Sequence, residues 1–261
     1  MSAGAQGGHD GIEAAVYDFR AQGIGHDSDA RPDLAPPSWL LTAGEALRFP
    51  SEYAASWLLD RLPGSSRDLG QGRPVLVLPG FGAGDRATAR LRDHLDQRGW
   101  TSYTWGVGPN HGLTDEVLDG VLARFDTVYD VERAPLDVVG WSFGGLLARW
   151  VAHQRPAQVR HLVTLGSPWR PEGERTRTTP LFERARRVHG LSERAEKVID
   201  ELRGPLPVPT TAIWSKTDGV VGWRGCRVDE SETAHNVAVP SSHLGLASNP
   251  FALAALTKAL A

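Results

Sequence analysis

The chain has 261 residues, of which 41% are hydrophobic and 23% are charged, and its formal net charge is −3 at pH 7. These values suit one large globular α/β domain and argue against a nucleic-acid surface, which needs a basic excess. The single cysteine, Cys226, excludes a framework of internal disulfides.

The N-terminus carries no recognisable targeting signal. Residues 1–11 lack the basic and apolar stretches of a secretory signal, and no run of 18 apolar residues could span a bilayer. We therefore expect a cytoplasmic protein with no transmembrane segment, although a signal removed from a longer precursor stays open.

Residues 1–70 are expected to form an N-terminal arm and helices that pack on the core. The first 37 residues are polar and glycine-rich. Two apolar stripes follow, one from Trp39 to Leu47 and one from Tyr53 to Leu62, and Pro50 between them is expected to end one helix and begin another. We expect both stripes to pack on the domain. Contact with lipid is the alternative, but no basic face supports it.

From residue 71 to residue 261, predicted strands and helices alternate. The continuous apolar run at 75–78 is typical of a central parallel strand that is covered on both faces. Thr114 is expected to cap the helix that follows it. Further strands are expected at 101–105, 136–139, 161–165, 211–214 and 236–239, and helices at 86–98, 114–131, 145–153 and 250–260. This alternation predicts a mostly parallel, doubly wound sheet.

Residues 169–209 interrupt the alternation. The segment carries charges of both signs and has a helical stretch at 181–203. A connection of this length within a compact domain is usually functional, so we expect a short helical cap over the active site. An ordinary crossover helix with a polar outer face is the alternative.

The segment Gly140–Gly145 (Gly-Trp-Ser-Phe-Gly-Gly) contains Gly-x-Ser-x-Gly between a predicted strand and a predicted helix. At such a turn the serine is held in a strained conformation with its hydroxyl exposed, and a Cβ at Gly140 or Gly144 would collide with neighbouring elements. Serine needs a base, and the base needs an orienting acid. Asp218 and His243 each follow a predicted strand, so both are expected to meet Ser142 at the carboxyl edge of the sheet.

Four segments together resemble the α/β-hydrolase superfamily, and more narrowly bacterial esterase/lipase-like serine hydrolases with a short cap. These segments are Leu78–Gly82, Gly140–Gly145, Ser215–Val221 and Ser241–Leu246. The resemblance covers residues from about 70 to the end, and it implies an α/β-hydrolase fold with a minimal sheet.

The resemblance also implies roles for individual residues. Ser142 would be the nucleophile, His243 the base and Asp218 the orienting acid, while the backbone N–H groups of Phe81 and Phe143 would form the oxyanion hole. The family more commonly has His-Gly where this chain has Pro79-Gly80, and that departure still leaves the backbone donor at Phe81.

Aromatic and histidine side chains are further candidates for the same site. Trp141 and Trp169 are candidate substrate contacts, since aromatic walls suit an apolar acyl or aryl group, and core packing is the alternative for both. His111 could also reach the crevice, although a loop role is favoured. No metal-binding signature or nucleotide loop is present, so no metal and no cofactor are expected. Structural positions are expected for the remaining candidates, Asp137, Asp229, His153, His161, His189 and His235.

The expected function is hydrolysis of a carboxylic ester, with an apolar acyl group, through an acyl-enzyme on Ser142. A thioesterase or an acyltransferase would use the same triad, as would a cofactor-free haloperoxidase, and a non-catalytic binding protein is a further alternative. The expected partner is a small ester or a lipid-like molecule.

Overall fold

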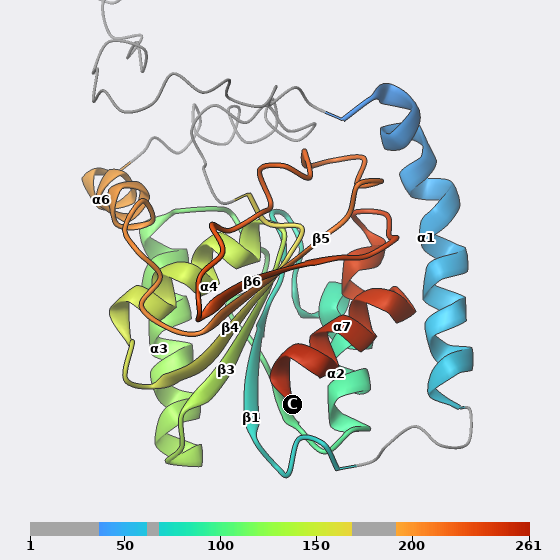
Figure 1. Cartoon of the computed structure of the whole chain (residues 1–261). Coiled ribbons are helices and arrows are strands. Elements are labelled where there is room, and N and C mark those ends of the chain that lie inside the picture. Colours follow the sequence, from blue (N-terminus) through green and yellow to red (C-terminus); the bar gives the residue numbers. More distant parts are fainter. Residues whose placement is uncertain (1–36, 62–67, 169–191) are drawn as a thin grey trace, which may run out of the picture. The chain divides into compact units, whose positions relative to one another are not determined.

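The computed structural model describes residues 37–61, 68–168 and 192–261, and its centre is a six-stranded sheet (Figure 1). The strand order is β2-β1-β3-β4-β5-β6, and every neighbouring pair is parallel. This confirms the predicted parallel α/β sheet. The strands are β1 (Pro74–Leu78), β2 (Thr101–Thr104), β3 (Leu136–Trp141), β4 (Val159–Leu165), β5 (Thr210–Trp214) and β6 (Ala234–Ala238).

Helices cover both faces of this sheet. They are α1 (Trp39–Asp60), the 3-10 turn η1 (Asp85–Thr88), α2 (Ala89–Asp96), α3 (Asp115–Glu132), α4 (Phe143–Gln154), α6 (Glu193–Glu201), the 3-10 turn η2 (Gly245–Ala247) and α7 (Pro250–Leu260). In Figure 1 the helices α3, α4 and α6 lie on one side of the sheet, and α1, α2 and α7 lie on the other. As predicted, the Thr114 hydroxyl caps α3 by accepting a hydrogen bond from the Val117 N–H at 3.3 Å.

Strand β1 shows why its sequence is continuously apolar. All of its residues are buried. Leu76 and Leu78 join the core that α3 and α4 line, whereas Val75 and Val77 join the core that α2 and α7 line. Because successive side chains of a strand point to opposite faces, a central strand needs apolar residues at every position.

The structure corrects the prediction for the segment around Pro50. One helix, α1, runs through this proline instead of two helices meeting at it. The apolar stripes were expected to pack on the domain, but most of their described residues face solvent, and Leu47 is 82% exposed. The helix packs on the domain through polar side chains, among them the buried Glu45 and Ser56. These contacts lie on both sides of Pro50. They keep the helix continuous there, although proline has no backbone N–H to donate.

A buried charge cluster anchors the C-terminal end of α1. The carboxylate of Asp60 accepts hydrogen bonds from Arg90 and from Arg98, the latter at 2.8 Å, and it lies 3.1 Å from Nδ1 of His94. Arg90 also donates to the hydroxyl and to the carbonyl oxygen of Ser56, both at 2.8 Å. Burial alone would raise the pKa of Asp60, but its three partners outweigh burial and hold the pKa far below its usual range. The cluster therefore ties α1 to α2.

Replacing Asp60 by asparagine should destabilise the fold, because two arginines would lose the negative charge that compensates for their burial. We expect the free energy of unfolding to fall by about 3–5 kcal/mol, measured by urea denaturation. The matched control is Asp200→Asn, which removes an exposed ion pair with Arg203 and should cost no more than about 1 kcal/mol. Equal losses in the two variants would contradict this account of the cluster.

Candidate active site

Ser142 occupies the turn between β3 and α4 in a backbone conformation that non-glycine residues rarely adopt. Its φ is 54° and its ψ is −126°. Its own N–H donates to the carbonyl of Leu165 at 2.8 Å, which fixes the turn to the neighbouring strand β4. Strain of this kind costs about 1–3 kcal/mol and persists only where the surroundings enforce it.

Three glycines allow the surroundings to enforce this turn. A Cβ on Gly140 would lie 2.4 Å from Cα of Gly145, and a Cβ on Gly144 would lie 2.4 Å from the carbonyl oxygen of Leu78. The predicted collisions at both positions are therefore confirmed. At Gly145, a Cβ would lie 1.9 Å from the hydroxyl of Ser167. Helix α4 thus starts in direct contact with β1 and β3, at the carboxyl edge of the sheet.

The structure brings Ser142, His243 and Asp218 into one chain of hydrogen bonds. Nε2 of His243 lies 2.9 Å from the hydroxyl of Ser142, and Nδ1 of His243 lies 2.7 Å from Oδ2 of Asp218. Asp218 is in the loop after β5 and His243 is in the loop after β6, and each is only 3% exposed. Because parallel strands end at one edge, three residues far apart in the sequence meet there.

The orientation of Asp218 determines which nitrogen of His243 carries the proton. Oδ1 of Asp218 accepts from the N–H groups of Val220 and Val221, both at 2.8 Å, so Oδ2 faces the imidazole. An ionised carboxylate only accepts hydrogen bonds, so Nδ1 of His243 must be the donor. Nε2 is then left with a lone pair that accepts from the hydroxyl of Ser142.

The charges around His243 change its affinity for a proton. Burial favours the neutral imidazole, but the charge and the hydrogen bond of Asp218 act in the opposite direction, and the charge of Glu45 adds to them. The net effect raises the pKa of His243 above its ordinary value of 6.5. The imidazole therefore forms a stabilised cation when it takes a proton.

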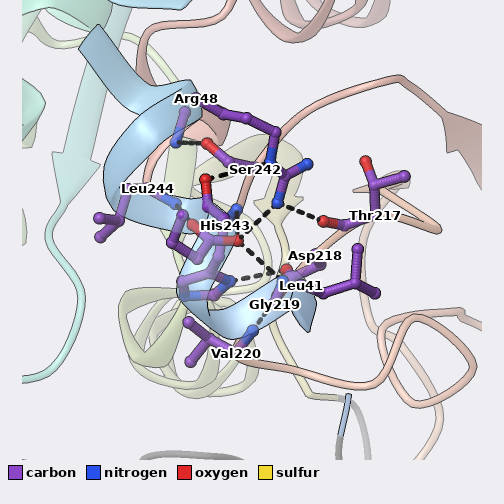
Figure 2. A network of polar contacts seen from close by, with 12 residues as sticks. Leu41, Arg48, Thr217, Asp218, Gly219, Val220, Ser242, His243 and Leu244 are labelled. Carbon is purple, nitrogen blue, oxygen red and sulfur yellow. Dashed lines mark hydrogen bonds and ion pairs between the residues drawn. The ribbon is translucent and has the colours of Figure 1, made fainter. Parts of the chain in front are cut away.

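Helix α1 contributes to the same site, which the sequence did not indicate (Figure 2). One oxygen of Glu45 accepts from the N–H groups of Gly219 and His243, and the other accepts from the N–H of Leu244. Glu52 accepts from the N–H and the hydroxyl of Ser242. No local motif marks these glutamates, since their partners lie more than 170 residues further along the chain.

The loop after β1, which contains Phe81, is braced by a further residue that the sequence did not single out. Asn110 is fully buried, donates from its side chain to the carbonyl of Pro79 at 2.8 Å, and accepts from the N–H of Gly82 at 2.7 Å. The rings of Phe81 and Phe143 lie edge to face, with centroids 5.9 Å apart. The neighbouring His111, which the sequence did single out, is exposed.

Of the two tryptophans predicted to contact substrate, the structure describes only Trp141. Trp141 is buried, and its ring N–H donates to the carbonyl oxygen of His243 at 3.0 Å, so it supports the histidine loop. Trp169 lies outside the described residues, as do His189 and most of the predicted cap. In the described part of that segment, α6 packs on α4, and Glu201 accepts from the ring N–H of Trp150 at 3.1 Å.

Asp137, His161 and His235 lie away from the site, as expected. All three belong to the amino-terminal halves of their strands, where Asp137 is in register with His161, and His235 with Thr211. Asp137 is fully buried and pairs with Arg160 at 2.6 Å. His153 lies on α4, and Asp229 is exposed in the loop between β5 and β6.

Neither a metal cluster nor a membrane-spanning helix occurs in the described part of the chain. Within residues 37–61, 68–168 and 192–261, no group of three or more His, Cys, Asp or Glu side chains is placed to hold a metal ion. In the same ranges, every helix is too short or too polar to cross a membrane.

No known protein-family profile matches the chain. A curated relative, the pimeloyl-[acyl-carrier protein] methyl ester esterase of Chromobacterium violaceum, is 29% identical over 139 residues, which is 51% of this chain and 51% of the relative. The enzyme of the same name from Neisseria meningitidis serogroup B is 31% identical over 107 residues, or 36% of each chain. The chain therefore spans about half the length, or less, of the curated relatives it matches.

Similar solved structures establish the fold. A structure reported for the metagenome-derived lipolytic enzymes LipS and LipT has a TM-score of 0.55 and 17% identity, and the match covers 76% of this chain and 98% of that one. Lipase B of Aspergillus fumigatus has a TM-score of 0.54 and 17% identity, over 77% of this chain and 55% of that one. These neighbours are lipases and esterases of the α/β-hydrolase fold, and this chain has that fold.

The charge environment of His243 can be measured directly by NMR titration of the imidazole. We expect a pKa above 6.5 in the wild-type protein, and a lower value in Asp218→Asn, because the carboxylate that stabilises the cation is gone. His161 serves as an internal comparison, since burial and the nearby Arg160 and His235 lower its pKa to about 4. A pKa of His243 at or below 6.5 in the wild type would contradict the geometry described.

Proposed function

We propose that the chain is a serine hydrolase that cleaves carboxylic esters through an acyl-enzyme on Ser142. The observation that carries the proposal is the hydrogen-bonded sequence of Ser142, His243 and Asp218, with links of 2.9 and 2.7 Å. The curated relatives are named as ester hydrolases, which favours an ester over a thioester as the substrate.

The reaction begins with attack of the Ser142 hydroxyl on the ester carbonyl carbon. Nε2 of His243 takes the hydroxyl proton, and Asp218 stabilises the imidazolium that forms. When the tetrahedral intermediate collapses, the imidazolium gives its proton to the leaving alcohol oxygen, and the acyl group stays on Ser142. Water then attacks the acyl-enzyme with His243 again as base, and the carboxylic acid is released.

The oxyanion of the tetrahedral intermediate needs hydrogen-bond donors that are already in place. We assign this role to the backbone N–H groups of Phe143 and Phe81. Phe143 directly follows Ser142 as the first residue of α4, where the helix dipole favours negative charge. One such donor is typically worth about 2.7–4 kcal/mol of transition-state stabilisation.

The residues beside Ser142 support an uncharged acyl or aryl group as the substrate. Phe81 and Phe143 form a half-buried aromatic pair next to the nucleophile. Aromatic surface of this kind binds apolar groups such as an acyl chain or an aryl ring. Of the tryptophans considered for substrate contact, Trp141 is bound to the histidine loop, so a direct role in substrate binding is proposed first for the two phenylalanines.

Ser142→Ala should abolish hydrolysis of p-nitrophenyl acyl esters while the fold is kept, because alanine offers no nucleophile. We expect kcat to fall by about 10⁶-fold, measured from release of p-nitrophenol. The control is Ser231→Ala, which replaces an exposed loop serine and should leave kcat unchanged. Turnover by Ser142→Ala at the wild-type rate would remove the proposed nucleophile.

A further inference from the structure

Helix α1 lies outside the sheet, yet it reaches both loops that carry the proposed acid and base. Oε1 of Glu45 accepts from the N–H of Gly219 and from the N–H of His243, both at 2.8 Å, and Oε2 accepts from the N–H of Leu244 at 3.0 Å. Gly219 directly follows the acid Asp218. One side chain is therefore bonded to the acid loop and to the base itself.

The carboxylate of Glu45 is buried, with only 6% of its side chain exposed. A buried carboxylate is costly unless its lone pairs are used, and here three backbone N–H groups and Arg48, at 3.3 Å, use them. Arg48 also donates to the carbonyl of Thr217 at 2.7 Å, one residue before the acid. Hydrogen bonds to an ionised acceptor are roughly twice as strong as neutral ones, so this clamp is stiff.

The backbone of α1 lies directly against the acid loop. A Cβ on Gly219 would lie 2.4 Å from the carbonyl oxygen of Leu41, so only glycine fits there. The hydroxyl of Thr42 donates to the carbonyl of Gly219 at 2.7 Å. Both polar groups of the Gly219 backbone are therefore bonded to side chains of α1.

A second carboxylate on the same face of α1, that of Glu52, binds the histidine loop. Glu52 follows Glu45 by seven residues, which is two helical turns, so both side chains point the same way. Its Oε1 accepts from the N–H of Ser242 at 2.9 Å, and its Oε2 accepts from the Ser242 hydroxyl at 2.7 Å. Glu52 thus fixes the histidine loop, whereas Glu45 joins that loop to the acid loop.

We propose, resting on the function proposed above, that Glu45 is a positioning residue that holds the Asp218 loop and the His243 loop at the separation where the triad hydrogen bonds form. Helix α1, which lies before the part of the chain that resembles the α/β-hydrolases, is on this account a working part of the catalytic centre. The negative charge of Glu45 also favours the imidazolium form of His243, so the residue acts on geometry and on charge together.

The test replaces Glu45 by glutamine and measures kcat, KM and the pH dependence of kcat/KM with a p-nitrophenyl acyl ester. Glutamine keeps the size of the side chain, but it lacks the charge and one acceptor oxygen. We expect kcat to fall about 10- to 100-fold with little change in KM, because the reacting groups are misplaced while the acyl pocket is kept. The acid limb of kcat/KM should move to lower pH, since His243 loses a charge that favours its cation.

Two further variants separate the effect of the Glu45 charge from the effect of its hydrogen bonds. Glu45→Asp keeps the charge but is too short to reach all three N–H groups, so kcat should fall while the acid limb stays near the wild-type position. Glu201→Gln removes a carboxylate on α6 that accepts from Trp150 and Gln154. It should leave both kcat and the acid limb unchanged.

An unmoved acid limb in Glu45→Gln, or a kcat equal to that of the wild type, would overturn the inference. A lower melting temperature with an unmoved limb counts against it as well, because a merely structural role has that signature. A wild-type protein that hydrolyses no ester would instead contradict the proposed function. The pKa of His243 by NMR, which should fall in Glu45→Gln, tests the charge independently of turnover.

Discussion

The hydrogen bond between the buried carboxylate of Asp218 and Nδ1 of His243 determines how the other groups of the site are arranged. Two backbone N–H groups occupy Oδ1 of Asp218, so Oδ2 alone faces the imidazole, and this fixes the tautomer that presents a lone pair to Ser142. The arrangement requires three loops to hold their side chains within about 0.5 Å of the reactive geometry. The parallel sheet supplies this agreement, because it ends β3, β5 and β6 at one edge.

Near that hydrogen bond, the backbone of Ser142 and the orientation of α1 both differ from what the local sequence favours. Both lie where function is proposed. Ser142 has a positive φ that only close packing of Gly140, Gly144 and Gly145 against their neighbours can enforce. Helix α1 departs in another way, since its carboxylates face the protein and most of its apolar residues face solvent. These three carboxylates, Glu45, Glu52 and Asp60, hold the helix, so its packing rests on charge and hydrogen bonds more than on apolar burial.

Much of the fold could be predicted because its signals are local. The apolar run at 75–78, the cap at Thr114 and the glycine turn around Ser142 each require their residue types where they stand. The direction in which α1 faces was predicted wrongly, because periodicity identifies an amphipathic helix but not which face is covered. Glu45 and Asn110 were missed for a related reason. Their partners are remote in the sequence, so no motif or residue spacing identifies them.

On the function proposed above, His243 and Asp218 together make the hydroxyl of Ser142 reactive at neutral pH. A fluorophosphonate that reacts covalently with activated serines tests it most directly, with the modified peptide identified by mass spectrometry. We expect one adduct, on Ser142, that forms rapidly in the wild-type protein and is lost in His243→Ala. Absence of an adduct in the folded wild-type protein, or an adduct on another serine, would contradict it.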